Sequence, residues 1–216
     1  MLKLADISFA FGENKLLEKV DLEFVSGEVI WITGPSASGK TTLLNIIATI
    51  IPKFIKGDFL GQVSWQGTDL NELKFPQMAT ILSFLRQQPQ QQLFFPTVEQ
   101  ELAFGPENLH KPALEISEKI GEVCKEMQIS KLRQAETAKL SFGQKKMVAL
   151  ASNLMLDAPL LLLDEPAAGI SENNLELIQQ VLKKLKNDGK IIIIADHQRV
   201  WQDLADRIIP MSELRC

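Results

Sequence analysis

The segment from Gly34 to Thr42, GPSASGKTT, constrains the fold more than any other part of the chain. It matches the pattern G-x-x-x-x-G-K-T and follows a β-branched and aromatic run at residues 29–33. An apolar helical segment, residues 43–47, comes directly after it. A strand, a glycine-bounded loop and a helix, in this order, are the context that a phosphate-binding P-loop requires. The sequence therefore predicts a site for a nucleoside triphosphate.

The residue types in this loop suit a triphosphate and its metal. Gly34 and Gly39 let the backbone curl, so that N–H groups face phosphate oxygens at the positive end of the new helix. Lys40 is expected to reach the β- and γ-phosphates, and the Thr41 hydroxyl is expected to bind Mg²⁺. The predicted nucleotide-contacting residues are Gly34, Pro35, Ser36, Ala37, Ser38, Gly39, Lys40, Thr41 and Thr42.

Composition limits the class of protein. With 216 residues the chain can bury one core, or one core with an inserted lobe. No apolar run approaches the roughly 20 residues that cross a bilayer, and the N-terminus lacks the apolar stretch of a signal peptide. A net charge of −4 argues against a large nucleic-acid footprint, so no nucleic-acid partner is expected. The two cysteines, Cys124 and Cys216, are interpreted as a core thiol and a tail thiol in a reducing cytoplasm.

Alternation of apolar residues predicts a small antiparallel layer ahead of the P-loop strand. Residues 2–11 and 20–24 alternate, and a turn at residues 12–14 separates them. Residues 61–65 and 80–85 are further strand candidates.

Two later apolar runs, residues 160–163 and 191–195, show no alternation. Runs of this kind are typical of parallel strands that are buried on both faces. A helical segment at about 172–187 separates them, and Gly189 follows where a helix stop belongs. The sequence thus predicts a βαβ unit within an α/β P-loop NTPase core with a mainly parallel sheet.

The middle of the chain has the sequence features of helices. A capping box at Thr97 opens one helix. Apolar residues spaced by four, three and four predict one face of a longer helix, namely Ile116, Ile120, Val123 and Met127. We therefore predict one domain, residues 1–216, with a nucleotide-binding core at 1–88 and 157–216 and an inserted helical lobe at 89–156.

Two acidic residues end the run at 160–163. Asp164 is placed to hold Mg²⁺ together with the P-loop Thr41. Glu165 comes next and is placed to polarise an attacking water as a general base. Paired acids after a strand can also form a solvated strand end, but a P-loop already supplies the phosphate and metal here.

The motif LSFGQ at residues 140–144 precedes this strand and resembles the signature L-S-G-G-Q of ABC-type ATPases. The resemblance covers nearly the whole chain and implies an ATPase that uses ATP and Mg²⁺. It implies that Ser141, Gly143 and Gln144 cap the γ-phosphate of the nucleotide held by a second ABC ATPase chain, identical or paralogous. Phe142 departs from the pattern, because it stands where the family has its first signature glycine.

The other motifs of the family follow in order. Phe11 stands in the place of the aromatic residue that stacks on adenine, and Gln87 in the place of the Q-loop glutamine, implying a role in catalysis and Mg²⁺ binding. Residues 167–171 occupy the D-loop position, with Ser171 in place of the usual aspartate. His197 stands where the family has its catalytic switch histidine; taken alone, it would more often be a structural histidine.

A finer resemblance links residues 92–99 and 103–109 to the ATPase subunits of energy-coupling factor (ECF) transporters, which take up vitamins or transition metals such as cobalt or nickel. It implies an integral membrane partner and a peripheral location at the cytoplasmic face of the cell membrane. The C-terminal extension of many ECF ATPases is not expected here. The groove that receives the partner is expected to be walled by Gln87, Gln88, Pro89, Phe94, Phe95 and Phe104.

Two alternatives belong to other functional classes. A soluble ABC ATPase that is not coupled to transport has the same motifs. A small-molecule kinase has a similar P-loop and length, but it has no use for residues 140–144, for Asp164 and Glu165 together, or for His197.

Overall fold

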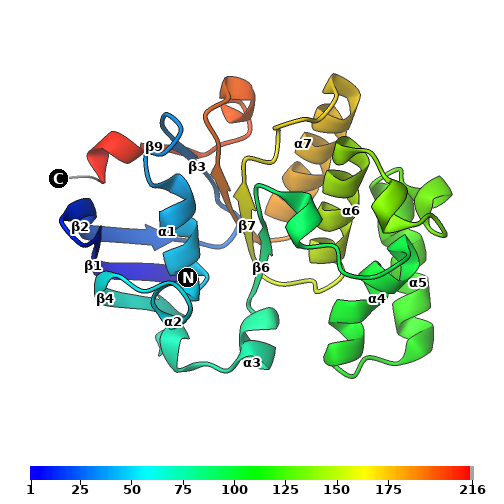
Figure 1. The fold of residues 1–216 in the computed structure, drawn as a ribbon, viewed down its shortest axis with the longest axis horizontal. Helices are drawn as coiled ribbons and strands as arrows, with labels where there is room; N and C mark the ends of the chain where they lie inside the picture. Colours follow the sequence, from blue (N-terminus) through cyan, green and yellow to red (C-terminus); the bar gives the residue numbers. More distant parts are fainter. Residues whose placement is uncertain (215–216) are drawn as a thin grey trace.

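Two β-sheets and a set of helices form successive layers in the computed structural model (Figure 1). The structure describes residues 1–214, so the predicted tail thiol Cys216 lies outside the described residues. An antiparallel sheet lies at one end, and α1 (Lys40–Ile47) separates it from a parallel sheet. Helices α4 (Val98–Asn108) and α5 (Ala113–Glu126) lie at the opposite end. Among the described helices, none is long and apolar enough to cross a membrane.

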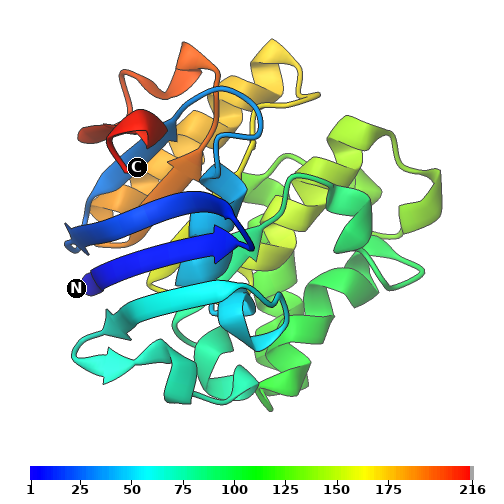
Figure 2. The same ribbon diagram turned by 60° about the vertical axis from the view of Figure 1, so that its left-hand side comes forward.

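The antiparallel sheet has the strand order β2-β1-β4-β5 (Figure 2). Its strands are β1 (Leu2–Phe11), β2 (Asn14–Phe24), β4 (Asp58–Trp65) and β5 (Thr68–Asp69). The predicted layer ahead of the P-loop strand is therefore confirmed. The predicted start of β4 at Gly61 was wrong, because pairing with β1 extends the strand back to Asp58, opposite Ala10. Gly61 has a φ of 97° and masks the alternation on which the prediction depended.

The parallel sheet has the order β6-β7-β8-β3-β9. Its strands are β3 (Val29–Thr33), β6 (Leu82–Leu85), β7 (Leu160–Asp164), β8 (Ile191–Ala195) and β9 (Arg207–Pro210). The two runs without alternation are interior strands, as predicted. The predicted start of β6 at Thr80 was two residues early. Strand β9 was not predicted, because it is a short edge strand and half of it is exposed.

Both faces of the parallel sheet are covered, which explains its unbroken apolar runs. Leu160 and Leu162 of β7 belong to the core shared with α1 and the antiparallel sheet. Leu161 and Leu163 belong to the core on the other face. Successive side chains of a strand point to opposite faces, so every residue of such a strand must be apolar.

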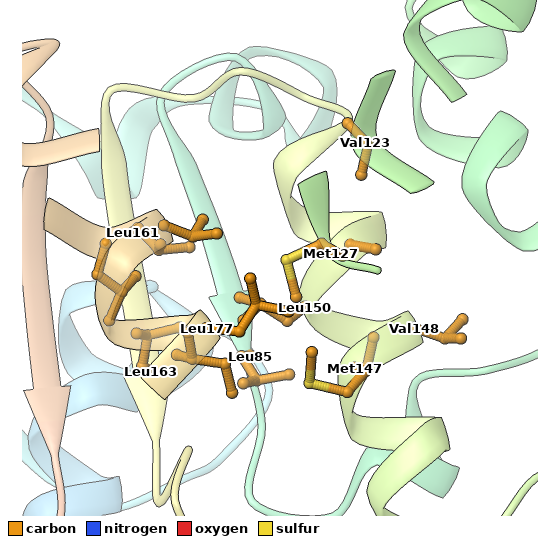
Figure 3. Close-up of a cluster of buried hydrophobic side chains, with 14 of the residues drawn as sticks. Leu85, Val123, Met127, Met147, Val148, Leu150, Leu161, Leu163 and Leu177 are labelled. Atoms are coloured by element: carbon orange, nitrogen blue, oxygen red, sulfur yellow. The ribbon is translucent and has the colours of Figure 1, made fainter. Parts of the chain in front are cut away.

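Helices α6 (Phe142–Leu154) and α7 (Glu172–Asn187) cover that other face. Figure 3 shows Leu161 and Leu163 on β7 with Leu85, Leu177 and side chains of α6 in one buried cluster. The remaining helices are short: α2 (Ile50–Lys53), α3 (Phe75–Ala79) and the 3₁₀ segments Leu70–Glu72, Pro89–Gln91, Ser130–Leu132, Thr137–Lys139, Arg199–Trp201 and Met211–Glu213.

The segment predicted as an inserted lobe, residues 89–156, contains α4, α5 and α6. The capping box at Thr97 is present, since its side chain accepts from Gln100 N. The four residues that defined the predicted apolar face are all buried, namely Ile116, Ile120, Val123 and Met127 at the C-cap of α5. These helices share one continuous core with the parallel sheet. Signature helix α6 is consequently packed directly onto the strands that carry the site.

Candidate functional site

The carboxyl ends of four adjacent parallel strands bring the predicted site residues together. The P-loop follows β3, and Gln87 lies two residues after β6. Asp164 is the last residue of β7 and Glu165 comes next, and His197 lies two residues after β8. In open α/β sheets, ligands bind outside this edge. A cavity of about 340 Å³ opens there, lined by Leu16, Ser36, Ala37, Ser38, Gly39, Lys40, Thr41, Thr42, Gln87 and Glu165.

The P-loop wraps around the ammonium of Lys40. Lys40 is the first residue of α1 and is 4% exposed. Its Nζ donates to Gly34 O at 2.8 Å and to Pro35 O at 2.9 Å, so the positive charge lies inside the loop. Gly39 has a φ of 99°, and a Cβ at Gly34 would lie 2.8 Å from the Ser38 hydroxyl. Both glycines are therefore required by the loop geometry, which concentrates positive potential at the cavity.

Two of the three predicted metal ligands, Thr41 and Asp164, are hydrogen-bonded to each other, whereas the third, Gln87, donates to Glu165. Thr41 Oγ1 donates to Asp164 Oδ2 at 2.8 Å. Asp164 is 2% exposed, and its other oxygen, Oδ1, is buried without a hydrogen-bond partner among residues 1–214. A hydroxyl and a carboxylate with a free lone pair are the oxygen ligands that Mg²⁺ prefers. The described residues hold no cluster of three acidic, His or Cys ligands, so phosphate oxygens and water would complete the coordination.

Burial raises the pKa of Asp164 from its ordinary value of 3.8 to about 6, although the Thr41 hydrogen bond acts in the opposite direction. The folded protein then binds this proton more tightly than the unfolded chain does. Its free energy of unfolding without metal should fall as the pH rises from about 4 to about 6, and the fall corresponds to about 3 kcal/mol.

Asp164→Asn removes this titration and keeps an oxygen for Thr41. We expect the variant to be more stable than wild type at pH 8 in EDTA, by up to about 3 kcal/mol. The difference should shrink as the pH falls to about 4. Urea unfolding of both proteins at the two pH values measures this. An equal difference at both pH values would show that Asp164 titrates normally.

Glu165 lies between two other predicted catalytic residues. Gln87 Nε2 donates to Glu165 Oε2 at 2.8 Å. His197 Nδ1 lies 3.9 Å from Glu165 Oε1. The Glu165 side chain is 15% exposed and lines the cavity. An amide and an imidazole thus flank a carboxylate at the place where the end of a phosphate chain bound by the P-loop would lie.

The backbone of Glu165 is left-handed, with a φ of 47°. This conformation costs about 1–2 kcal/mol for a residue with a side chain. The Glu165 N–H donates to Ala195 O of β8 at 2.8 Å, which helps to hold it. Strain of this kind is found at functional sites, where the surrounding structure fixes a reactive side chain.

The signature residues lie apart from this cavity. Ser141 caps the N-terminus of α6: its Oγ accepts from Gln144 N at 3.3 Å, and its N–H donates to Gln144 Oε1 at 2.9 Å. Ser141 and Gln144 are exposed and Gly143 is partly exposed, and none of them lines the P-loop cavity. Within one chain, this helix end therefore lies outside the lining of the chain's own cavity.

Phe11 also lies outside the cavity lining. Its ring is 45% exposed at the end of β1 and packs edge-on against Phe9, with ring centroids 4.8 Å apart. Leu16 of β2 lines the cavity instead. The sequence prediction missed Leu16, because a buried strand leucine carries no signal of a ligand.

A buried network behind His197 was missed as well. Asp196 is fully buried, and its Oδ2 accepts from Trp201 Nε1 at 3.0 Å. Trp31 Nε1 donates to Asp196 O at 2.9 Å. These bonds fix the loop that carries His197. The sequence did not reveal the network, because Trp31 lies 165 positions from Asp196 in the chain.

Comparison with known protein families matches residues 17–168, more than half of the chain, to the family described as ABC transporter. The chain belongs to the ABC transporter family. Among its relatives, a protein of Treponema denticola that is provisionally named an ABC transporter ATP-binding protein is 33% identical over 98% of this chain. A similarly named protein of Sulfurisphaera tokodaii is 36% identical, also over 98% of this chain. The chain spans 44% and 45% of these two relatives, less than half of each.

Solved ABC structures share the fold. The structure of cbiO1 from Clostridium perfringens, described as part of the ABC transporter complex cbiONQ, is 28% identical with a TM-score of 0.82, over 97% of this chain and 83% of that one. A bacterial ABC transporter cassette solved as a dimer is 27% identical with a TM-score of 0.84, over 97% and 94%. The same cassette was also solved in a post-hydrolysis state bound to ADP and Pi.

Proposed function

We propose that this chain binds ATP with Mg²⁺ and hydrolyses it as the motor subunit of a membrane transporter. The observation that carries the proposal is the carboxylate of Glu165, which lies between Gln87 and His197 beside the P-loop cavity. The solved ABC cassette with ADP and Pi supports ATP hydrolysis in the family.

The residues suggest a mechanism. Lys40 and the P-loop N–H groups hold the β- and γ-phosphates. Glu165 accepts a proton from water as the water oxygen bonds to the γ-phosphorus and the bond to the bridging oxygen of ADP breaks. Gln87 orients Glu165, and His197 donates toward the γ-phosphate. Mg²⁺ held by Thr41 and Asp164 would neutralise developing charge on the phosphate oxygens.

A second ATPase chain completes the site in this proposal. Ser141, Gly143 and Gln144 are arranged at a helix N-terminus, where N–H groups and the helix dipole favour an anion. They do not line the cavity of their own chain, so in this proposal they bind the γ-phosphate of a nucleotide that the partner chain holds. The dimeric structure of a similar cassette supports this arrangement. We propose that residues 89–156 form the lobe that presents them.

The partner surface is an apolar groove of about 410 Å³ between α3 and α4. Phe75 of α3 lies on one side, and Phe94 and Phe104 lie on the other. These rings are 63%, 75% and 44% exposed, an unusual exposure for phenylalanine in a soluble domain. We propose that a short helix of an integral membrane subunit fills this groove. The chain would then be held at the cytoplasmic face of the membrane.

The groove walls differ from the sequence prediction. Gln87, Gln88 and Pro89 are not among the lining residues. Neither is the half-buried Phe95, whose ring centroid lies 4.8 Å from that of Phe104. The opposite wall is α3, which carries Phe75. Nothing in the sequence around residue 75 shows that α3 lies across from α4.

Hydrogen bonds connect the groove to the catalytic residues. Buried Glu101 accepts from Phe94 N at 2.7 Å and holds the backbone that carries the exposed ring. Gln92 lines the groove, and its Oε1 accepts from Arg86 N at 2.8 Å, next to Gln87. Movement of a helix in the groove can thus be transmitted to the backbone next to Gln87, whose side chain contacts Glu165. This short route gives ATP hydrolysis a physical link to a membrane partner.

We further propose ECF-type uptake of a vitamin or a transition metal. The support is the resemblance of residues 92–109 and the similarity to cbiO1, which is described as part of a transporter complex. A soluble ABC ATPase remains the competing function. Because the chain belongs to the ABC transporter family, we do not propose the small-molecule kinase function.

Site-specific crosslinking tests the transport proposal. With both native cysteines replaced by alanine, Phe94→Cys is expected to crosslink to an integral membrane protein when the neighbouring genes are co-expressed. Leu114→Cys is the matched control, because Leu114 is also apolar and 72% exposed but lies outside the groove. Crosslinks from Phe94→Cys to soluble proteins alone would favour the soluble ATPase.

A further inference from the structure

Lys146 of α6 is a buried cation that the proposed mechanism does not use. It is fully buried, and its Nζ donates to Glu165 O at 2.6 Å and to Ala168 O at 2.9 Å. Burial lowers the pKa of Lys146, and the nearby carboxylates of Asp196, Glu165 and Asp164 act in the opposite direction. A buried ammonium is costly unless it is well hydrogen-bonded, so this position places strong demands on the groups around it.

The two carbonyls belong to the loop that carries the general base. Glu165 and Ala168 begin and end a turn, in which Ala168 N donates back to Glu165 O at 3.2 Å. Glu165 O therefore accepts from both Ala168 N and Lys146, while Glu165 itself is left-handed. The Lys146 ammonium therefore holds both ends of the turn. Because one of these ends is the carbonyl of Glu165, it also fixes the direction of the Glu165 side chain.

Lys146 is part of the same helix end as the signature residues. It follows Ser141 by five residues, about 7.5 Å along the axis of α6. Phe142 strengthens the connection, because its ring centroid lies 5.5 Å from Lys146 Nζ. A Cβ at Gly169 would lie 2.6 Å from that ring, so the ring also packs against the end of the Glu165 loop. A shift at the start of α6 must therefore move the loop as well.

We propose that Lys146 is a positioning residue, which holds the backbone of Glu165 from α6 and thereby links the signature end of the helix to the chain's own general base. The inference rests on the proposed ATP hydrolysis. Nucleotide bound against Ser141 in a dimer would fix the start of α6, and Lys146 would transmit that position to Glu165. The presence of ATP in one site would then affect the position of Glu165 in the other site through this side chain.

Lys190 provides a matched control within the chain. Its Nζ also donates to two loop carbonyls, Asp157 O and Ala158 O, both at 2.9 Å. These carbonyls precede β7, at the opposite end of the strand from Glu165. Lys190→Met removes the same kind of contact, together with an ion pair to Asp157 Oδ1 at 2.7 Å, without touching the catalytic loop.

The test compares steady-state ATP hydrolysis, binding of a non-hydrolysable ATP analogue, and thermal unfolding. Lys146→Met is expected to lower kcat by about 10- to 100-fold, because a small misplacement of a catalytic group has effects of this size. Affinity for the analogue should stay within about threefold. Lys146→Arg should restore most of kcat, since its guanidinium can donate to both carbonyls. Lys190→Met should lose stability and keep wild-type kcat.

Wild-type kcat in Lys146→Met would overturn the inference, as would an equal loss of kcat in Lys190→Met. Should methionine prevent folding, Lys146→Gln is the second variant, because it keeps N–H donors on a shorter arm. A reduced kcat is again expected there, and an unchanged kcat contradicts the role. Absence of hydrolysis by wild-type protein would instead contradict the proposed function itself.

Discussion

Glu165→Gln is expected to lower the rate of ATP hydrolysis by about 10²- to 10⁴-fold and to leave ATP binding intact. The amide has the shape of the carboxylate and still offers an oxygen to Gln87 Nε2, but it cannot take a proton from water. The P-loop contacts are untouched. Phosphate release at saturating Mg-ATP measures the first effect, and calorimetric titration with ATP measures the second.

Glu136→Gln is the control, because Glu136 is a surface carboxylate paired with Lys139. It should hydrolyse ATP at the wild-type rate. If Glu165→Gln retains more than about a tenth of that rate, the general base is another group. A loss of ATP affinity in this variant would instead assign Glu165 a structural role in the cavity.

Lys40→Ala should weaken ATP binding by about 100-fold or more. The substitution removes the ammonium that donates to Gly34 O and Pro35 O, and with it the charge that faces the triphosphate. Charge-assisted hydrogen bonds contribute about 1.5–3 kcal/mol each, and 1.4 kcal/mol corresponds to tenfold in affinity. Titration calorimetry with ATP and Mg²⁺ gives the affinities of both proteins.

Lys139→Ala is the matched control, since Lys139 is exposed on the surface and should not change ATP affinity. Hydrolysis by Lys40→Ala should fall together with binding. Wild-type ATP affinity in Lys40→Ala would show that the P-loop cavity is not the nucleotide site.

Much of the geometry of the candidate nucleotide site could be predicted from the sequence because its parts are local. A strand, a loop and a helix place Lys40 and Thr41 with few degrees of freedom. Asp164 could be placed beside Thr41 because carboxyl ends of parallel strands share one edge of a sheet. The same rule explains why Gln87 and His197 lie on either side of Glu165, although 110 positions separate them in the chain.

What could not be predicted depends on tertiary packing. In the sequence, Lys146 resembles any other lysine of a helix. Its burial follows only from the way α6 lies on the parallel sheet. Phe75 joins the groove because α3 crosses toward α4. Strand β9 has too few buried residues to show a pattern. Each of these requires knowledge of which elements are neighbours, which periodicity along one segment does not contain.

In the proposed function, ATP is bound between two chains, with the P-loop of one facing Ser141, Gly143 and Gln144 of the other. Light scattering of Glu165→Gln during size exclusion tests it directly, because the variant should bind ATP and fail to release the dimer by hydrolysis. With Mg-ATP its mass should double relative to the nucleotide-free protein. Adding Ser141→Arg, which places a bulky side chain at the proposed contact, should return it to a monomer. A mass that stays monomeric at saturating Mg-ATP, both alone and with a co-expressed paralogous chain, would contradict this arrangement.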